Sequence, residues 1–369
     1  MRADKPLVMI SAGGTGGHLF PAEALAGILR ARGCGIVLVT DNRIGELAER
    51  FPANEVVAIP AATPSGRSPV AALKALVTLA RGFFRARRLI ARARPDVVVG
   101  FGGYPTVPPL LAGSLAGYRT VLHEQNGVIG RANRFLAGRV THLASSVPEL
   151  RGISDAMKAK IVMTGNPVRA NVLEAAQIPY PAATDDAPLN LLAFGGSQGA
   201  RIMSDIVPQA IALLTPELRA RIRITQQARP EDLERVRDVY AQNGVSAEIA
   251  PFFRDLPGRI ARSHLVISRS GASTVSELAV IGRPAILVPL PGALDQDQAA
   301  NAALLSDTGA ALMLPQTEFT PQRLAQELTS RLADPEGLTK AAQAAKSAGI
   351  PDAAERLADL VMRLASKQG

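Results

Sequence analysis

The sequence has no tryptophan, few aromatic residues and a single cysteine. Aromatic residues make up only 4% of the 369 positions, which argues against a stacking platform for nucleic-acid bases. Cys34 has no second cysteine to pair with, so an internal disulfide and a cysteine-based metal site are excluded. This cysteine usage is typical of a reducing compartment such as the cytoplasm.

Long uninterrupted apolar segments are also missing. The apolar run at residues 6–10 is too short for the core of a signal peptide. Residues 97–118 are 22 uncharged positions, but five of them are glycine and three are proline, which does not suit a lipid-spanning helix. We therefore expect no transmembrane segment and no targeting peptide.

Charge is distributed unevenly along the chain, whose net charge is +9. Residues 1–170 hold 22 Lys and Arg against 10 Asp and Glu, a net charge of +12, whereas the remaining residues hold 19 against 22, a net charge of −3. A basic half of this kind favours an anionic partner, either nucleic acid or a membrane surface. An unevenly charged surface that is merely solvated is the alternative.

Short β-branched runs alternate with longer helical patterns. Helices are predicted, for example, at residues 21–32 and 70–94, and strands at residues 7–11, 35–40, 55–60, 96–100, 120–124, 142–146, 221–227, 247–252, 264–270 and 285–291. This order favours parallel sheets with helices on both faces, which is an α/β fold.

The pattern restarts near the middle of the chain. Residues 179–190, rich in Pro, Ala and Asp, are typical of a linker. Residues 189–207 then repeat the order of strand, glycine loop and helix found at residues 7–25. We therefore expect two doubly wound domains, residues 1–168 and 169–349, and a final helix within residues 350–369.

Glycine-rich turns follow several predicted strands: GGTGGH at residues 13–18, GFGGYP at 100–105 and GGSQGA at 195–200. Such glycines let backbone N–H groups approach a phosphate at the positive end of a helix dipole, although a tight turn alone explains any single loop. Three loops at strand ends favour an anionic ligand, because open α/β sheets bind ligands there.

His18 follows the first glycine loop and is a candidate general base, or a helix-start residue hydrogen-bonded to the backbone. His123, at a strand end beside Glu124 and Asn126, is interpreted as structural. Asp41 ends the second strand and could hold a ribose, as in a dinucleotide-binding fold. GGTGGH, however, lacks the glycine fingerprint of that fold.

Two later segments carry polar groups suited to a nucleotide sugar. SRSGASTVSEL at residues 268–278 offers hydroxyl and N–H groups to a diphosphate, and Glu277 could accept two ribose hydroxyls; Ser and Thr are also common helix caps. Asp295 and Asp297 form an Asp-x-Asp pattern that some sugar transferases use for a metal. Asp295 and Gln298 could equally bind sugar hydroxyls, and we expect no metal.

Together these motifs resemble the MurG family of UDP-N-acetylglucosamine (UDP-GlcNAc) transferases, which convert lipid I to lipid II in bacterial cell-wall synthesis. The resemblance covers essentially the whole chain through GGTGGHLFP, GFGGYPTVPPLLA, LHEQNGVIGRANR, TGNPVR, FGGSQGAR and SRSGASTVSE. It implies a GT-B architecture of two doubly wound Rossmann-like domains facing a cleft, with the C-terminal helix returning to the first. It also implies an inverting transfer without metal or cofactor, in which UDP-GlcNAc is a substrate.

The resemblance assigns roles to individual residues. His18 is the candidate base, and Glu124, beside Asn126, is our second candidate. Asn126 resembles the contact to the GlcNAc ring, and Glu277 the contact to the ribose. The residues expected to bind UDP-GlcNAc are Thr15, Gly16, Gly17, Asn126, Arg169, Ser197, Phe253, Ala272, Ser273, Thr274, Val275, Ser276, Glu277 and Gln298.

In the implied reaction, the C4 hydroxyl of the N-acetylmuramyl unit attacks the anomeric carbon, a base removes its proton, and UDP leaves. Arg169, Ser197 and helix N-termini would stabilise the diphosphate, and backbone groups at Phe253 would face uracil. Two departures stand out. The family usually has a His-Gln pair where this chain reads ITQQAR, with Thr225 in place of the histidine, and Asp297 replaces a glutamine found in some members.

The predicted helix at residues 70–94 carries a basic stripe. At ~100° per residue, the stripe spans about 60° of the helix surface. It comprises Lys74, Arg81, Arg85, Arg88 and Arg92. The opposite side of the helix carries the apolar residues Leu76, Leu79, Phe83 and Ile90. Such a helix suits an anionic bilayer, or else packs an apolar face in the core beneath a solvated basic stripe.

We thus expect UDP-GlcNAc, lipid I, an anionic membrane surface and other cell-wall synthesis proteins as partners, with peripheral attachment to the cytoplasmic face of the inner membrane. Another UDP-sugar transferase or an epimerase of GT-B fold is the first alternative. A nicotinamide-dependent oxidoreductase using Asp41 is a second. A nucleic-acid-binding protein is a third, although the chain has no recognised nucleic-acid motif and few aromatic residues.

Overall fold

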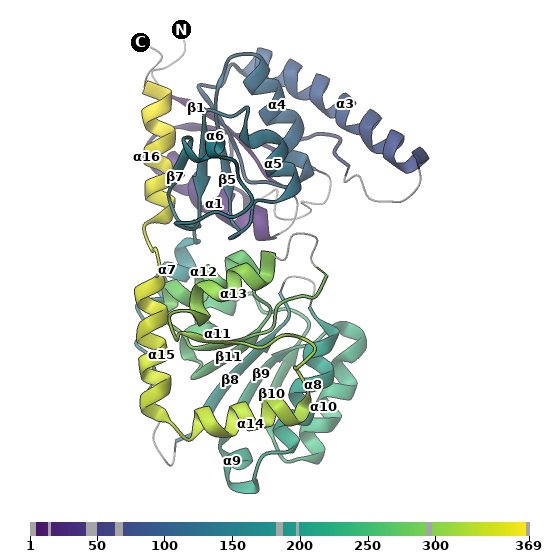
Figure 1. Ribbon diagram of the computed structural model, residues 1–369, viewed down its shortest axis with the longest axis vertical. Helices are drawn as coiled ribbons and strands as arrows, with labels where there is room; N and C mark the ends of the chain where they lie inside the picture. Colours follow the sequence, from purple (N-terminus) through teal and green to yellow (C-terminus); the bar gives the residue numbers. More distant parts are fainter. Residues whose placement is uncertain are drawn as a thin grey trace. The chain divides into compact units, whose positions relative to one another are not determined.

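The computed structural model describes residues 5–13, 16–41, 50–62, 69–181, 187–196, 199–292 and 297–366. The chain forms two compact units (Figure 1). Unit 1 comprises Met1–Arg169 and Pro351–Gly369, and unit 2 comprises Ala170–Ile350. Each contains one sheet whose assigned strand pairs are all parallel. The expected α/β fold with two doubly wound halves is confirmed.

Unit 1 alternates strands with helices. Its elements are β1 (Leu7–Ser11), α1 (Gly16–Ala31), β2 (Gly35–Thr40), β3 (Glu55–Ala58), α3 (Pro69–Ala93), β4 (Val97–Gly100), the 3-10 helix η2 (Tyr104–Thr106), α4 (Val107–Leu115), β5 (Arg119–Glu124), α5 (Arg131–Ala137), β6 (His142–Ser145), α6 (Asp155–Lys158), β7 (Ile161–Met163) and α16 (Ala353–Ser366).

The sheet of unit 1 has the strand order β3-β2-β1-β4-β5-β6-β7. The chain runs from β1 outward to β2 and β3 and then returns to the other side of β1 with β4. The strand order therefore reverses between β1 and β4. Ser11, the last residue of β1, lies opposite Gly100, the last residue of β4. The loops that follow the two strands therefore start side by side, at the point where doubly wound sheets bind ligands.

The C-terminal helix α16 packs on unit 1 beside α1 (Figure 1). Its apolar side chains Leu357 and Val361 are buried in the same core cluster as Leu25 of α1. Arg32 pairs with Glu355 and with Asp359, whose Oδ1 lies 2.6 Å from Arg32 Nη1. Burial of apolar area is the main attachment, because the ion pairs are partly exposed.

Unit 2 repeats the same organisation. Its elements are α7 (Ala170–Ala175), β8 (Leu189–Phe194), α8 (Arg201–Ala212), α9 (Pro216–Arg221), β9 (Ile222–Gln227), the 3-10 helix η3 (Pro230–Asp232), α10 (Leu233–Gln242), β10 (Ser246–Ala250), α11 (Leu256–Arg262), β11 (Leu265–Ser268), α12 (Ala272–Ile281), β12 (Ala285–Leu287), α13 (Asp297–Ser306), β13 (Ala311–Met313), α14 (Pro321–Leu332) and α15 (Pro335–Ala348).

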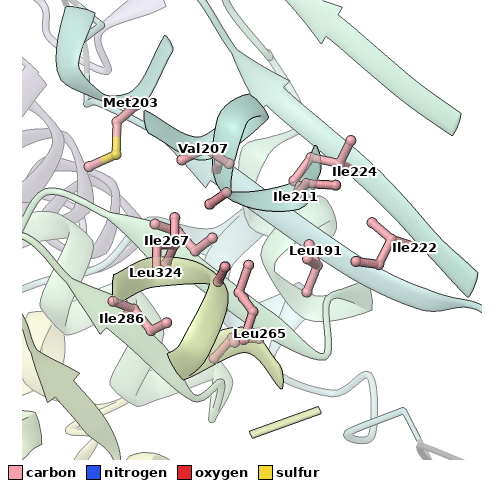
Figure 2. Close-up of a cluster of buried hydrophobic side chains, with 14 of the residues drawn as sticks. Leu191, Met203, Val207, Ile211, Ile222, Ile224, Leu265, Ile267, Ile286 and Leu324 are labelled. Atoms are coloured by element: carbon pink, nitrogen blue, oxygen red, sulfur yellow. The ribbon is translucent and has the colours of Figure 1, made fainter. Parts of the chain in front are cut away.

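The sheet of unit 2 has the order β10-β9-β8-β11-β12-β13, which reverses between β8 and β11. Figure 2 shows one side of this sheet, where Leu191, Ile224 and Ile267 meet Val207 of α8 and Leu324 of α14. These side chains are almost completely buried. The central strands are continuous apolar runs because helices cover both faces of a parallel sheet.

Helix α3 is buried unevenly along its length. Ile90 is buried and Phe83 is half-buried, as the apolar side requires, but Leu76 is 63% exposed. Val70, Leu73 and Val77 are exposed as well. Figure 1 shows the N-terminal end of α3 projecting from unit 1. The alternative, in which the apolar side packs in the core, therefore fits Ile90 but not Leu76 in the first half of the helix.

Candidate functional site

In unit 1, the first turn of α1 faces the loop after β4. A Cβ atom added at Gly102 would lie 3.4 Å from His18 Cδ2, and one added at Gly103 would lie 3.5 Å from His18 Cε1. Both glycines have positive φ, +85° and +75°, a conformation that other residues adopt at a cost. The half-buried His18 ring therefore packs directly against the GFGG turn, at the point where the strand order reverses between β1 and β4.

Thr106 holds this turn in place. Its hydroxyl is within hydrogen-bond distance of Gly102 O (2.8 Å) and Ser11 O (3.2 Å), and it is completely buried. Gln125 adds a second tie, because its Nε2 donates to Phe101 O at 2.7 Å. The ends of β1, β4 and β5 are thus joined by side-chain hydrogen bonds around the glycine turn.

Glu124 is the centre of a hydrogen-bond network at the end of β5. Its Oε1 accepts from the backbone N–H and the Nδ2 of Asn126, at 3.0 and 3.1 Å. Its Oε2 accepts from Gly130 N at 3.0 Å and from Asn133 Nδ2 at 2.7 Å. Burial raises the pKa of this carboxyl, and the four N–H donors oppose that shift. Glu124 holds Asn126 and the start of α5 in place.

His123 is buried on the other side of β5. Its Nε2 lies 3.0 Å from Gly165 O, and its ring packs against Phe101 with 5.3 Å between ring centroids. Complete burial lowers the pKa of His123 to about 4. The ring is therefore neutral near pH 7, with Nε2–H donating to Gly165, and the interpretation of His123 as structural agrees with this geometry.

Arg169 lies close to the start of α1. Its guanidinium carbon is 3.8 Å from the centroid of the Phe20 ring, a cation–π contact. A Cβ added at Gly16 would lie 2.9 Å from Phe20 Cε2, so Gly16 leaves room for this ring. Burial raises the pKa of Glu23, and the charge of Arg169 opposes that shift. Unit 1 therefore brings His18, Gly16, Gly17 and Arg169 to one end of one helix.

In unit 2, the N-terminus of α12 lies at the β8/β11 reversal. Gly271 is its N-cap, and the first helical hydrogen bond runs from Val275 N to Gly271 O at 3.0 Å. The N–H groups of the first turn, Ala272 to Thr274, have no intrahelical carbonyl to bond and point along the helix axis, which suits an anion. Glu277 lies one turn further on and is buried.

Gln298, near the start of α13, is tied to the same loops. Its Oε1 accepts from Leu290 N at 3.1 Å, and its main-chain oxygen accepts from the Ser270 hydroxyl at 2.8 Å. Val275 is buried, and the Ser276 hydroxyl donates to Ala272 O within the helix at 2.9 Å.

The Phe253 side chain is fixed by its contact with Arg259. The ring is buried beneath Arg259, whose guanidinium carbon lies 4.3 Å from the ring centroid. Arg259 Nε in turn donates to Asp255 Oδ1 at 2.8 Å. The main chain at Phe253 can therefore present its groups in a constant position.

The structure does not describe every residue that was expected to bind a ligand. Thr15, Ser197 and Asp295 lie outside the described residues. Within residues 16–41, 199–292 and the other described ranges, no group of three His, Cys, Asp or Glu side chains is placed to hold a metal ion. No helix in the same part of the chain is long and apolar enough to cross a bilayer.

The sequence reasoning missed Arg269 and Gln227. Arg269 is buried, and its Nη1 donates to Val288 O and Pro289 O at 3.1 and 3.0 Å, so it holds the loop that carries Leu290. Gln227 bonds two loops of unit 2. Their position in the sequence was the available signal, because both are polar residues at the carboxyl end of a predicted strand, as Asp41 is.

Comparisons with known proteins agree with this architecture. The glycosyltransferase family 28 N-terminal domain matches residues 8–145, and the glycosyltransferase family 28 C-terminal domain matches residues 190–357. A relative from Methylobacterium nodulans, named UDP-N-acetylglucosamine--N-acetylmuramyl-(pentapeptide) pyrophosphoryl-undecaprenol N-acetylglucosamine transferase, is 61% identical over 99% of this chain and 98% of its own length. A protein of the same name from Methylobacterium sp. strain 4-46 is 60% identical, with 99% and 98% covered.

Comparison with a solved structure also shows similarity over nearly the whole chain. The crystal structure of Acinetobacter baumannii MurG is 30% identical to this chain, with a TM-score of 0.78 over 97% of this chain and 99% of that one. Sequence and fold therefore agree along nearly the full length, and the chain belongs to the MurG family of glycosyltransferases.

Proposed function

We propose that this chain transfers GlcNAc from UDP-GlcNAc to the C4 hydroxyl of the N-acetylmuramyl unit of undecaprenyl-pyrophosphate-linked lipid I. The product is lipid II, the precursor used in peptidoglycan synthesis. The observation that carries the proposal is the 61% identity, over 99% of the chain, to a relative that bears the name of this activity.

Unit 2 is the proposed binding unit for UDP-GlcNAc. The first turn of α12 would receive the diphosphate together with Ser197, and Glu277 would accept the ribose hydroxyls. The backbone at Phe253 would face uracil, and Gln298 would donate its Nε2 to a sugar hydroxyl. The positive end of a helix next to a leaving diphosphate stabilises the charge that develops there.

His18 is the proposed base. It lies at the β1/β4 reversal and is half-buried, and histidine is suited to accept a proton near neutral pH. Glu124 remains the second candidate, but to act it would have to release donors that now occupy both of its oxygens. We therefore propose that Glu124 orients Asn126, which would contact the GlcNAc ring. Arg169 would contact the diphosphate, and Gly16 and Gly17 would face donor and acceptor.

Contact with an anionic membrane is proposed for α3. Its basic stripe, Lys74, Arg81, Arg85, Arg88 and Arg92, is exposed throughout. The exposed apolar residues Val70, Leu73, Leu76 and Val77 lie on the same helix. An apolar and basic helix surface suits peripheral binding to the cytoplasmic leaflet that carries lipid I. Other cell-wall synthesis proteins are proposed partners at that membrane.

The test is transfer of radiolabelled GlcNAc from UDP-GlcNAc to a lipid I analogue, with the lipid-linked disaccharide as the expected product. The Glu277→Ala variant is the matched control for donor binding. Conversion of UDP-GlcNAc to another UDP-sugar without the acceptor would instead support the epimerase alternative. Failure to modify the analogue, with UDP still bound, would reject lipid I as the acceptor.

A further inference from the structure

We propose that Gln227 is a positioning residue that joins the diphosphate loop to the uracil loop and thereby sets the affinity for UDP. The inference deepens the proposed function and rests on it, because it takes residues 195–200 as the diphosphate loop and residues 251–253 as the uracil loop.

Gln227 uses the two ends of its side-chain amide on two different loops. It is the last residue of β9, which lies between β8 and β10 in the sheet, and it is 6% exposed. Its Oε1 accepts from Gly195 N at 3.1 Å, directly after β8. Its Nε2 donates to Pro251 O at 3.1 Å, directly after β10. One buried side chain therefore bridges the exits of both neighbouring strands.

The two described ends of the diphosphate loop, Gly195 and Gly199–Ala200, are closely packed. A Cβ added at Gly195 would lie 2.2 Å from Ala200 N, so the two ends of the loop are in close contact. Gly199 has φ +70°, and a Cβ there would lie 2.9 Å from Arg229 Cγ. Gly195 and Gly199 therefore both contact the segment that begins with Gln227, so a shift of that segment would displace these two ends of the loop.

The uracil loop is tied to the same segment. Ala228 N donates to Ala250 O at 3.1 Å, which extends the β9–β10 pairing by one step beyond the strands. Phe253 is buried under Arg259 at the far end of the loop. Gln227 thus sets the spacing between the groups proposed to hold uracil and those proposed to hold diphosphate. A preset spacing favours a ligand that spans both, because less ordering is needed on binding.

The adjacent residue, Gln226, provides a matched control. It has the same side chain but points to the opposite face of β9, where it is completely buried. Its Oε1 accepts from the Tyr240 hydroxyl, and its Nε2 donates to Met203 O at 3.2 Å. These bonds connect β9 to α8 and α10 inside the core. Gln226→Met should therefore lower the melting temperature and leave donor binding unchanged.

The experiment compares Gln227→Met with Gln226→Met in the full chain, by steady-state transfer kinetics and by calorimetric titration with UDP and uridine. For Gln227→Met we expect KM for UDP-GlcNAc and Kd for UDP to rise about tenfold, the size of one or two lost hydrogen bonds. Uridine affinity, kcat and KM for the lipid I analogue should change less than threefold. Gln227→Glu keeps the acceptor for Gly195 but loses the donor to Pro251, so it should also weaken UDP binding and serves if the Met variant does not fold.

The outcomes separate the inference from the function on which it rests. If wild-type protein binds UDP and Glu277→Ala weakens that binding, but neither Gln227 variant does, the positioning role is rejected and the donor site stands. Equal loss of UDP and uridine affinity in both Gln226→Met and Gln227→Met would show a general effect of the core and would also overturn it. A wild-type protein that binds no UDP would reject the proposed donor instead.

Discussion

His123 makes the stability of unit 1 depend on pH, and the size of this effect follows from its surroundings. Complete burial lowers the pKa of His123 from the ordinary 6.5 to about 4. Between these values the unfolded chain binds a proton that the folded chain does not, so the free energy of unfolding falls as the pH falls. Stability from this residue is fully present above the unfolded pKa and is lost on acidification toward the folded one.

The full difference in pKa corresponds to about 3 kcal/mol, of which about 2 kcal/mol should be lost between about pH 7 and about pH 5. The structural reason lies at Nδ1. Among the described residues, none hydrogen-bonds this buried nitrogen, so protonation would place an unpaired N–H donor in the core. A charge would also be buried beside Phe101, where the ring has a hydrogen bond to Gly165 O.

His123→Gln is the informative variant, because its side-chain N–H can still reach Gly165 O but does not titrate. Urea unfolding of both proteins at the two pH values gives a double difference in the free energy of unfolding, and we expect about 2 kcal/mol. Overall stability of the variant is not the readout, since the exchange also alters packing. Parallel pH profiles for the two proteins would refute the assignment of a neutral, buried His123.

Four other predictions concern catalysis, donor binding and membrane binding. His18→Ala should lower kcat by roughly 10² to 10⁴ with little change in KM for UDP-GlcNAc, and an acidic limb of kcat against pH that survives in the variant would place the base elsewhere. Glu277→Ala should weaken UDP binding by ~1 to 3 kcal/mol in calorimetry, and an unchanged Kd would leave it a structural role. Transfer should continue in EDTA, and full loss restored by Mn²⁺ or Mg²⁺ would favour a metal. Arg81, Arg85 and Arg88 changed to Glu should release the protein from anionic vesicles, at ~1 kcal/mol per residue, without affecting UDP binding.

The fold could be predicted because its signal is carried by long apolar strands. The runs at Leu7–Ser11 and Gly35–Thr40 match the predicted strands residue for residue. Two strands of three residues, Ile161–Met163 and Ala311–Met313, were not predicted. Both lie at one edge of their sheets, where pairing on one side only supports short strands that leave little pattern in the sequence.

Helix boundaries near the glycine loops were less predictable. A helix starting at Pro21 was expected, because proline is common in the first turn and glycine usually is not. The helix starts at Gly16 instead, so that Gly16 and Gly17 belong to its first turn. Contacts from residues distant in sequence, such as Arg169 on Phe20, support this turn. Local propensity is a weak guide where tertiary packing of this kind is present.

The glycine loops are similar in sequence, but different groups occupy the space beside their glycines. At Gly102 and Gly103 the space left by missing side chains admits the ring of His18. At Gly195 the missing side chain instead allows the loop to close on Ala200, and Gln227 holds the result. A glycine shows only that something approaches the backbone closely. The approaching group can be a ligand, a side chain or another stretch of main chain, and segments that are far apart in sequence decide which. The structure is therefore needed to assign a role to each loop.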